Sequence, residues 1–218
     1  MSTRDFLAET LNQFYQPRET RPIGEWAYEN ITLEGAENRM YAGTPYDVRL
    51  TSYNQVVFDF LQDPSDRELI ILKSSQIGLT LAVFIGLAWT TKYNPGNLLY
   101  VAKDVLSVRE LGKQRLTPIM CQVSPEFADE IGERDQTIQV KKINGVTMRL
   151  IGAQSASGFI SFPCSIAALD ETEVHGELDE GSTIALTRAR FKGDSDYKMI
   201  VFSKAQDSPI YETDKITK

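Results

Sequence analysis

The sequence is poor in cysteine and histidine and has no long apolar run. Its two cysteines, Cys121 and Cys164, cannot form a disulfide framework, which favours a reducing compartment. The most apolar stretch, residues 79–89, is much shorter than the ~20 residues that a membrane-spanning helix needs. The amino-terminal residues carry charges within their apolar pattern, unlike a signal peptide. We therefore expect a cytosolic protein.

Positive charge is also scarce. The formal net charge is −7 and the sequence pI is about 4.9, so the chain lacks the basic footprint that is typical of nucleic-acid binding. Contact with DNA would have to come from a local patch, a missing segment or a ring of subunits. The 218 residues, 42% hydrophobic and 24% charged, are typical of a globular protein with one sizeable core.

Apolar runs alternate with turn signals and predict an α/β fold. Residues 1–45 are expected to form an amino-terminal helix and an irregular arm, and residues 46–218 a single domain. An Asn-Gly pair at residues 144–145 predicts a β-hairpin from residues 137–140 and 146–151, at an edge or as an insertion. The other predicted strands, all buried, are residues 69–72, 98–102, 165–169 and 199–202, and the predicted helices are residues 53–62, 79–91, 105–121 and 183–189. This order predicts a mostly parallel central sheet flanked by helices, with ligands at the carboxyl ends of its strands.

One of these strand ends has the layout of a phosphate-binding loop. The stretch "KSSQIGLT" follows a predicted strand and opens a predicted helix, so backbone N–H groups and the helix dipole can converge on an anion. Compared with the regular pattern G-x-x-x-x-G-K-[ST], Leu79 replaces the usual lysine and Lys73 replaces the first glycine. Lys73 can swing into the loop, and Thr80 can offer its hydroxyl to Mg²⁺. The alternative is an ordinary strand–turn–helix with an exposed Lys73. The predicted ATP-binding residues are Lys73, Ser74, Ser75, Gln76, Ile77, Gly78, Leu79 and Thr80.

Two adjacent carboxylates, Asp170 and Glu171, follow another predicted strand. ATP hydrolysis needs one carboxylate to hold Mg²⁺ and another to position or deprotonate the attacking water, so we predict these roles for Asp170 and Glu171 respectively. A solvated acidic turn is the alternative, because more acidic residues follow. A metal site of Asp170, Glu171, Glu173 and His175 lacks the spacing of a zinc or two-metal site. The stretch "GAQSASG" lacks the G-x-S-x-G spacing of a serine nucleophile.

Other residues are candidates for contacts with the nucleotide. Tyr46, Tyr53 and Gln55 precede the loop and can stack on adenine or pair with its edge, although such residues more often cap or pack a helix. Arg188 and Arg190 can act as an arginine finger, which stabilises the charge of the transition-state phosphate. Arginines near a helix end more often interact with the helix dipole or lie on the surface in solvent.

The order and spacing of these motifs resembles the ATPase domain of tailed-phage terminase large subunits of the GpA type. The resemblance runs from about residue 26 to the carboxyl terminus. It implies an ASCE/RecA-like P-loop NTPase in which residues 73–80 are the Walker A motif, with its lysine at the start of the loop. Asp170 and Glu171 then correspond to the Walker B pair, and Ser203 to a coupling motif. The motifs that carry the resemblance are "TPY", "ILKSSQIGLT", "NPGNLLYVAKD", "RLTPIM", "IGAQSASG", "AALDETE" and "EGSTIALTRAR".

The resemblance implies a motor that uses ATP and Mg²⁺ to drive double-stranded viral DNA into a preformed capsid. Its implied partners are the portal protein, the terminase small subunit and other copies of the chain, in a pentameric ring on the capsid and as a monomer in solution. The expected location is the host cytoplasm and, transiently, the portal vertex. The acidic charge predicts weak DNA binding by the isolated domain.

The sequence departs from the family pattern at two places. These departures leave open which residues couple ATP hydrolysis to movement and which arginine contacts the phosphate of the transition state. Lys204 and Ala205 replace the expected Thr-Pro after Ser203, and residues 157–163 hold no arginine where the family often has one. The nuclease domain that the family carries is not expected in these residues, because no later acidic cluster is present.

Two other functions compete with the motor. A helicase-like, DNA-stimulated ATPase would need a second RecA-like domain, for which 218 residues leave no room. A non-hydrolysing interaction module is favoured by Leu79 and the altered coupling motif. The Asp170–Glu171 pair argues against such a module, because two adjacent carboxylates beside a phosphate loop are costly and would have no role in a site that binds no nucleotide.

Overall fold

The chain forms a six-stranded sheet with helices on both faces. The computed structural model describes residues 21–34, 41–124, 127, 139–143, 145–160, 162–191 and 193–204. The strand order is β1-β6-β5-β2-β4-β3, and every neighbouring pair is parallel except β3 and β4. The strands are β1 (Glu68–Lys73), β2 (Leu98–Ala102), β3 (Val140–Ile143), β4 (Val146–Gly152), β5 (Ile166–Asp170) and β6 (Lys198–Lys204). The mostly parallel sheet is confirmed. A hairpin of β3 and β4 lies at one edge, but its first strand is Val140–Ile143 and not residues 137–140 as predicted.

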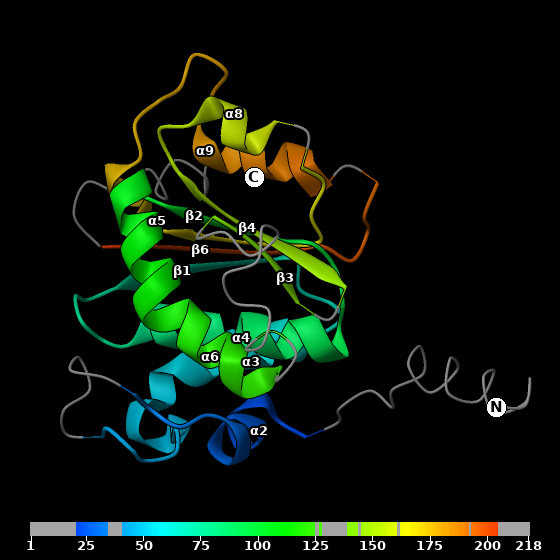
Figure 1. The fold of residues 1–218 in the computed structure, drawn as a ribbon. Helices are drawn as coiled ribbons and strands as arrows, with labels where there is room; N and C mark the ends of the chain where they lie inside the picture. Colours follow the sequence, from blue (N-terminus) through cyan, green and yellow to red (C-terminus); the bar gives the residue numbers. More distant parts are fainter. Residues whose placement is uncertain are drawn as a thin grey trace, which may run out of the picture.

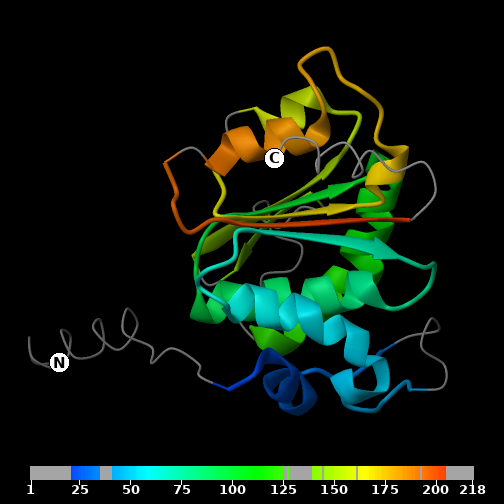
Figure 2. The same cartoon turned by 180° about the vertical axis from the view of Figure 1, so that it is seen from behind.

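The two faces of the sheet bury separate hydrophobic clusters, and Figures 1 and 2 show the helices on either side. The larger cluster lies under α2 (Ile23–Asn30), the 3₁₀ segment η2 (Val48–Asn54), α3 (Gln55–Gln62), α4 (Leu79–Tyr93), α5 (Val105–Leu111) and α6 (Thr117–Val123). The smaller cluster lies under α8 (Ala156–Phe159), α9 (Thr183–Arg188) and η5 (Ala189–Phe191). Within the described part of the chain, no helix has the length and apolar character to cross a membrane.

Helix α4 is the central helix of the larger cluster. It is buried along almost its whole length, which explains why its sequence is apolar all round rather than amphipathic. Gly86 lets α3 approach closely, since an added Cβ there would lie 2.4 Å from Leu61 Cδ1. The helix begins at Leu79, within the predicted phosphate-binding stretch of residues 73–80, so this packing fixes the position of one wall of the candidate site.

The helix predicted at residues 105–121 contains a π-helical segment, η3 (Gly112–Leu116), between α5 and α6. Pro118 in the first turn of α6 has no N–H to donate and would clash with the carbonyl four residues earlier. The backbone N–H of Thr117 accordingly bonds to the Gly112 carbonyl, five residues back. The sequence did not predict this change of helical register.

One expectation about the fold needs correction. Strand β1 is at the sheet edge and is not fully buried, because Ile70 and Leu72 are 38% and 44% exposed and the smaller cluster contains no β1 residue. Residues 1–45, which were predicted to form a helix and an irregular arm, include α2, whose Trp26 packs edge-on against Tyr93 of α4. Residues 1–20 lie outside the described residues, and the domain boundary at residue 46 stays a prediction.

Candidate functional site

The loop between β1 and α4 has a backbone suited to binding an anion. Gln76 and Gly78 both have positive φ, 58° and 74°, and Gly78 is the residue before the first turn of α4. A positive φ is uncommon for a residue other than glycine, so the loop is held in a specific shape at Gln76. No described side chain caps α4, so the N–H groups of its first turn and its positive dipole end are available to a ligand.

Segment η2 supports the loop from outside. The Tyr53 hydroxyl donates to the Ile77 carbonyl at 3.0 Å, and the Asn54 amide donates to the same oxygen at 3.4 Å. Asn54 is almost fully buried, whereas the Tyr53 side chain is largely exposed. These two contacts fix the position of the loop relative to the segment that precedes β1. The sequence did not predict the role of Asn54.

The strand register brings distant polar residues to one face at the carboxyl end of the sheet. Lys73 is the register partner of Lys204, and Asp170 is the partner of Phe202. Because side chains alternate along a strand, these residues lie on the same face as the α4 cluster, together with Tyr100 of β2. Lys73 Nζ lies 4.8 Å from the centre of the Phe202 ring.

Asp170 is the centre of this arrangement. Its Oδ1 accepts from Lys73 Nζ at 3.1 Å, and its Oδ2 accepts from the Thr80 hydroxyl at 2.9 Å and the Tyr100 hydroxyl at 2.8 Å. The Lys73 and Asp170 side chains are only 10% and 8% exposed. Burial, together with the neighbouring Asp170 charge, raises the pKa of Tyr100 well above its usual value, so the phenol remains a donor. The Lys73 side chain is therefore largely buried in an ion pair, unlike the exposed lysine of an ordinary strand–turn–helix.

The oxygen atoms of Thr80 and Asp170 fit a magnesium ion that is bound together with phosphate. Mg²⁺ prefers oxygen ligands and usually takes only one or two carboxylates from the protein, with phosphates and water completing its shell. A hydroxyl and a carboxylate within 2.9 Å of each other are such a donor set.

The four-residue metal cluster that includes His175 is not formed. Among the described residues, no group of three or more histidine, cysteine, aspartate or glutamate side chains could hold a metal ion. Both ring nitrogens of His175 are occupied, Nε2 with the Asp170 carbonyl at 2.9 Å and Nδ1 with the Thr183 hydroxyl at 3.0 Å. Burial lowers the pKa of His175, although the hydrogen bond to Asp170 and the nearby acidic charges act in the opposite direction. The histidine thus ties the end of β5 to the start of α9.

Glu171 follows Asp170 in a left-handed conformation, with φ 54° and ψ 46°. Its Oε1 lies 3.3 Å from Lys204 Nζ, and Glu173 Oε1 lies 3.8 Å from the same ammonium. Glu173 also accepts from the Ser203 hydroxyl at 2.7 Å and from the Lys204 backbone N–H at 3.1 Å. Burial raises the pKa of Glu173, but these hydrogen bonds outweigh burial and hold the pKa below its usual value. The predicted coupling residue Ser203 therefore contacts the turn that follows β5, while residues 205–209 of the predicted coupling motif lie outside the described part.

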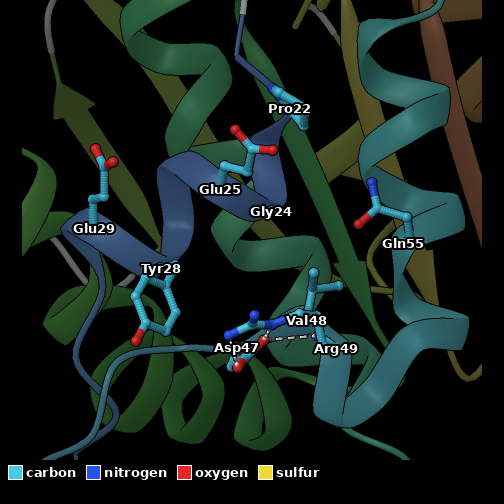
Figure 3. A pocket seen from close by; sticks show the side chains of 9 residues that line it. All are labelled: Pro22, Gly24, Glu25, Tyr28, Glu29, Asp47, Val48, Arg49 and Gln55. Atoms are coloured by element: carbon cyan, nitrogen blue, oxygen red, sulfur yellow. Dashed lines mark hydrogen bonds and ion pairs between the residues drawn. The ribbon is translucent and has the colours of Figure 1, made fainter.

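The three residues predicted to contact adenine have different surroundings. Tyr46 is buried in the core against Phe58, and burial raises its pKa. Gln55 donates to Asp59 and lines a separate cavity of about 700 Å³ between α2 and η2 (Figure 3). Of the three, only Tyr53 contacts the loop. The residues that line the cavity include none from the loop: Pro22, Gly24, Glu25, Tyr28, Glu29, Asp47, Val48, Arg49 and Gln55.

Neither predicted arginine is among the groups around Asp170 of its own chain. Arg188 forms a two-point ion pair with Glu68, at 2.8 and 2.5 Å. Glu68 begins β1, so this pair lies at the opposite end of the strand from Lys73. Arg190 follows in η5, where its Nε is buried without a hydrogen-bond partner among the described residues. A role on a neighbouring subunit stays a prediction for both.

The sequence matches the family model described as the phage terminase large subunit gpA ATPase domain over residues 42–214. No curated protein sequence gives a significant match.

The solved structures that resemble the fold include two large terminases. The crystal structure of the HK97 bacteriophage large terminase has 10% identity and a TM-score of 0.59, covering 86% of this chain and 38% of that one. A variant of the ATPase domain of the Thermus phage P74-26 large terminase has 12% identity and a TM-score of 0.51, covering 78% and 69% respectively. At these identities the likeness shows the fold alone. The chain corresponds to 38% of the length of the HK97 large terminase.

Proposed function

Because the chain belongs to the family of phage terminase large subunit gpA ATPase domains, we propose that it hydrolyses ATP to drive double-stranded viral DNA into a procapsid. The observation that carries the proposal is the convergence of Lys73, Thr80 and Asp170. Lys73 and Asp170 are 97 positions apart in the sequence, yet they meet at the mouth of a loop shaped for phosphate. An interaction module without nucleotide would gain little from burying this set of charges.

Each part of the site has a defined task in the proposed reaction. The N–H groups of the loop and of the first turn of α4 bind the phosphates, and Lys73 supplies positive charge in place of the lysine that Leu79 replaces. Thr80 and Asp170 would hold Mg²⁺, which neutralises phosphate charge during the transfer. Tyr100 orients the Asp170 carboxylate through its 2.8 Å hydrogen bond. Glu171 orients the attacking water and accepts its proton.

The proposed partners follow from the family. They are double-stranded DNA, the portal, the small subunit and other copies of this chain, in a ring at the portal vertex in the host cytoplasm. The net charge of −7 supports weak, salt-dependent DNA binding by the isolated domain. The ring would bring several weak contacts to one duplex.

The experiment is a steady-state assay of phosphate release from Mg-ATP by the 218-residue chain, with Glu171→Gln and the exposed control Glu177→Gln. We expect slow hydrolysis by the wild type and the control. Glu171→Gln should lose about two orders of magnitude in rate while still binding ATP, because it keeps the shape of the side chain but cannot accept the proton. Equal rates for wild type and Glu171→Gln would contradict the role of Glu171. A folded wild type that binds Mg-ATP without releasing phosphate would favour the non-hydrolysing module.

A further inference from the structure

Two lysines, rather than one, lie at the carboxyl end of the sheet beside the loop. Lys73 ends β1 and Lys204 ends β6, and they are register partners on adjacent parallel strands. Adjacent strands are about 4.8 Å apart, and paired residues point to the same face. Strand β6 lies between β1, which carries the loop, and β5, which carries Asp170. Lys204 therefore stands between the two halves of the proposed ATP site.

Each lysine is paired with one of the two adjacent carboxylates. Lys73 Nζ is 3.1 Å from Asp170 Oδ1, and Lys204 Nζ is 3.3 Å from Glu171 Oε1. The hydrogen bond to Glu171, together with the charge of that carboxylate, raises the pKa of Lys204, so the ammonium form is favoured. Without nucleotide, the two lysines thus supply the positive charge that faces the two adjacent carboxylates.

The two ion pairs differ in how easily they can open. The Lys73–Asp170 pair is buried, whereas the Lys204 and Glu171 side chains are 43% and 30% exposed. Partly exposed pairs of this kind are weak, because water competes for both charges. The other carboxylate near the ammonium, Glu173, is farther away, at 3.8 Å. The Lys204 backbone is held independently by its N–H bond to Glu173, and Ser203 bonds to the same carboxylate. The ammonium can therefore move while the end of β6 stays in place.

We propose that Lys204 is a second phosphate-binding lysine, which leaves Glu171 and contacts the terminal phosphate of ATP. This inference rests on the proposed function. It assigns a task to the residue that departs from the family's coupling motif, and it adds a second positive charge beside that of Lys73. The same movement would free the Glu171 carboxylate to accept a proton from water. ADP lacks the terminal phosphate and would leave Lys204 on Glu171.

The test is calorimetric binding of a non-hydrolysable ATP analogue and of ADP, each with Mg²⁺, to the 218-residue chain. We expect Lys204→Met to weaken binding of the analogue at least fivefold and to change ADP binding less than twofold. Lys204→Arg keeps the charge and should retain most of the preference for the analogue. The control is Lys92→Met, in the last turn of α4 and roughly 20 Å from the loop along the helix, which should bind both nucleotides like the wild type.

The outcomes separate this inference from the proposed function. If the wild type binds the analogue and Lys204→Met keeps the wild-type ratio of analogue to ADP affinity, Lys204 does not contact the terminal phosphate. Equal weakening for both nucleotides would also overturn the inference, because it indicates a structural role. If the folded wild type binds neither nucleotide, the proposed function fails and the inference with it.

Discussion

The ion pair between Lys73 and Asp170 predicts a large energetic coupling in the nucleotide-free chain. The perturbations are Lys73→Met, Asp170→Asn and the double variant. Methionine keeps the length of the lysine stem without its charge, and asparagine keeps an oxygen that can accept from Thr80 and Tyr100. Each single variant leaves one buried charge without its partner, whereas the double variant leaves neither.

The magnitude follows from distance and burial. Two unit charges 3.1 Å apart attract by about 5 kcal/mol at an effective dielectric constant of about 20. Desolvation offsets much of this attraction, but breaking a buried pair by removing one partner still costs about 3–5 kcal/mol. Removing both charges avoids that cost. We expect the double variant to be more stable than the sum of the single effects predicts, by roughly 3 kcal/mol.

The assay is urea unfolding of the wild type and the three variants without nucleotide, analysed as a double-mutant cycle. A matched control is the Arg67–Asp196 pair, which has a similar distance of 3.0 Å but side chains that are 31% and 84% exposed. Its coupling should be several-fold smaller, because water screens it. If the Lys73 and Asp170 effects add within about 0.5 kcal/mol, the buried pair does not exist in solution and the reasoning is refuted.

Three further predictions concern the loop, a thiol and the histidine. Gly78→Ala should destabilise the chain by about 1–2 kcal/mol and weaken Mg-ATP binding, since φ at this position is 74° although there is room for a Cβ. Cys164 should resist alkylation in the native chain at about pH 8, because burial raises its pKa to about 12, and it should react on unfolding. Burial lowers the pKa of His175 in the folded state, so the free energy of unfolding should fall as pH falls below about 6.5, where only the unfolded chain takes up the proton. His175→Gln should remove this part of the pH dependence.

Each of these predictions has its own control. Gly176→Ala should be nearly neutral, because Gly176 has no neighbouring atom within 4 Å of an added Cβ and no positive φ; equal effects at both glycines would argue against backbone strain at Gly78. Rapid native alkylation of Cys164, shown by peptide mapping, would contradict its burial. Unchanged pH dependence between pH ~5 and ~6.5 in His175→Gln would show that other groups dominate that window.

The sequence was sufficient to predict the sheet type and the end at which the site lies. Apolar runs separated by helices indicated parallel strands, and the carboxyl-end rule brought residues 73–80 and Asp170 to one edge. The hairpin was predicted from its Asn-Gly turn. The exposure of Ile70 and Leu72 was not, because a short apolar run looks the same in an edge strand as in a central one.

The partners of the site residues could not be predicted, because they depend on strand order. Lys204 meets Glu171 only because β6 lies between β1 and β5. Tyr100 appears as part of an ordinary buried strand until β2 is placed beside β5. Asn54 contacts the loop through the packing of η2, which no local pattern encodes. The ion pair of Arg188 with Glu68 joins residues 120 positions apart and could not be predicted either. The role of Arg188 as an arginine finger stays a prediction.

The central claim is that residues 73–80 bind Mg-ATP with Lys73 as the charged residue of the loop. The most direct measurement is equilibrium binding of Mg-ATP to the wild type and to Lys73→Met, with each shown to be folded by circular dichroism. The account predicts that the wild type binds and that the variant binds at least tenfold more weakly, a loss of about 1.4 kcal/mol. Equal affinity of the two proteins would contradict it, because Lys73 would then be no part of the nucleotide site.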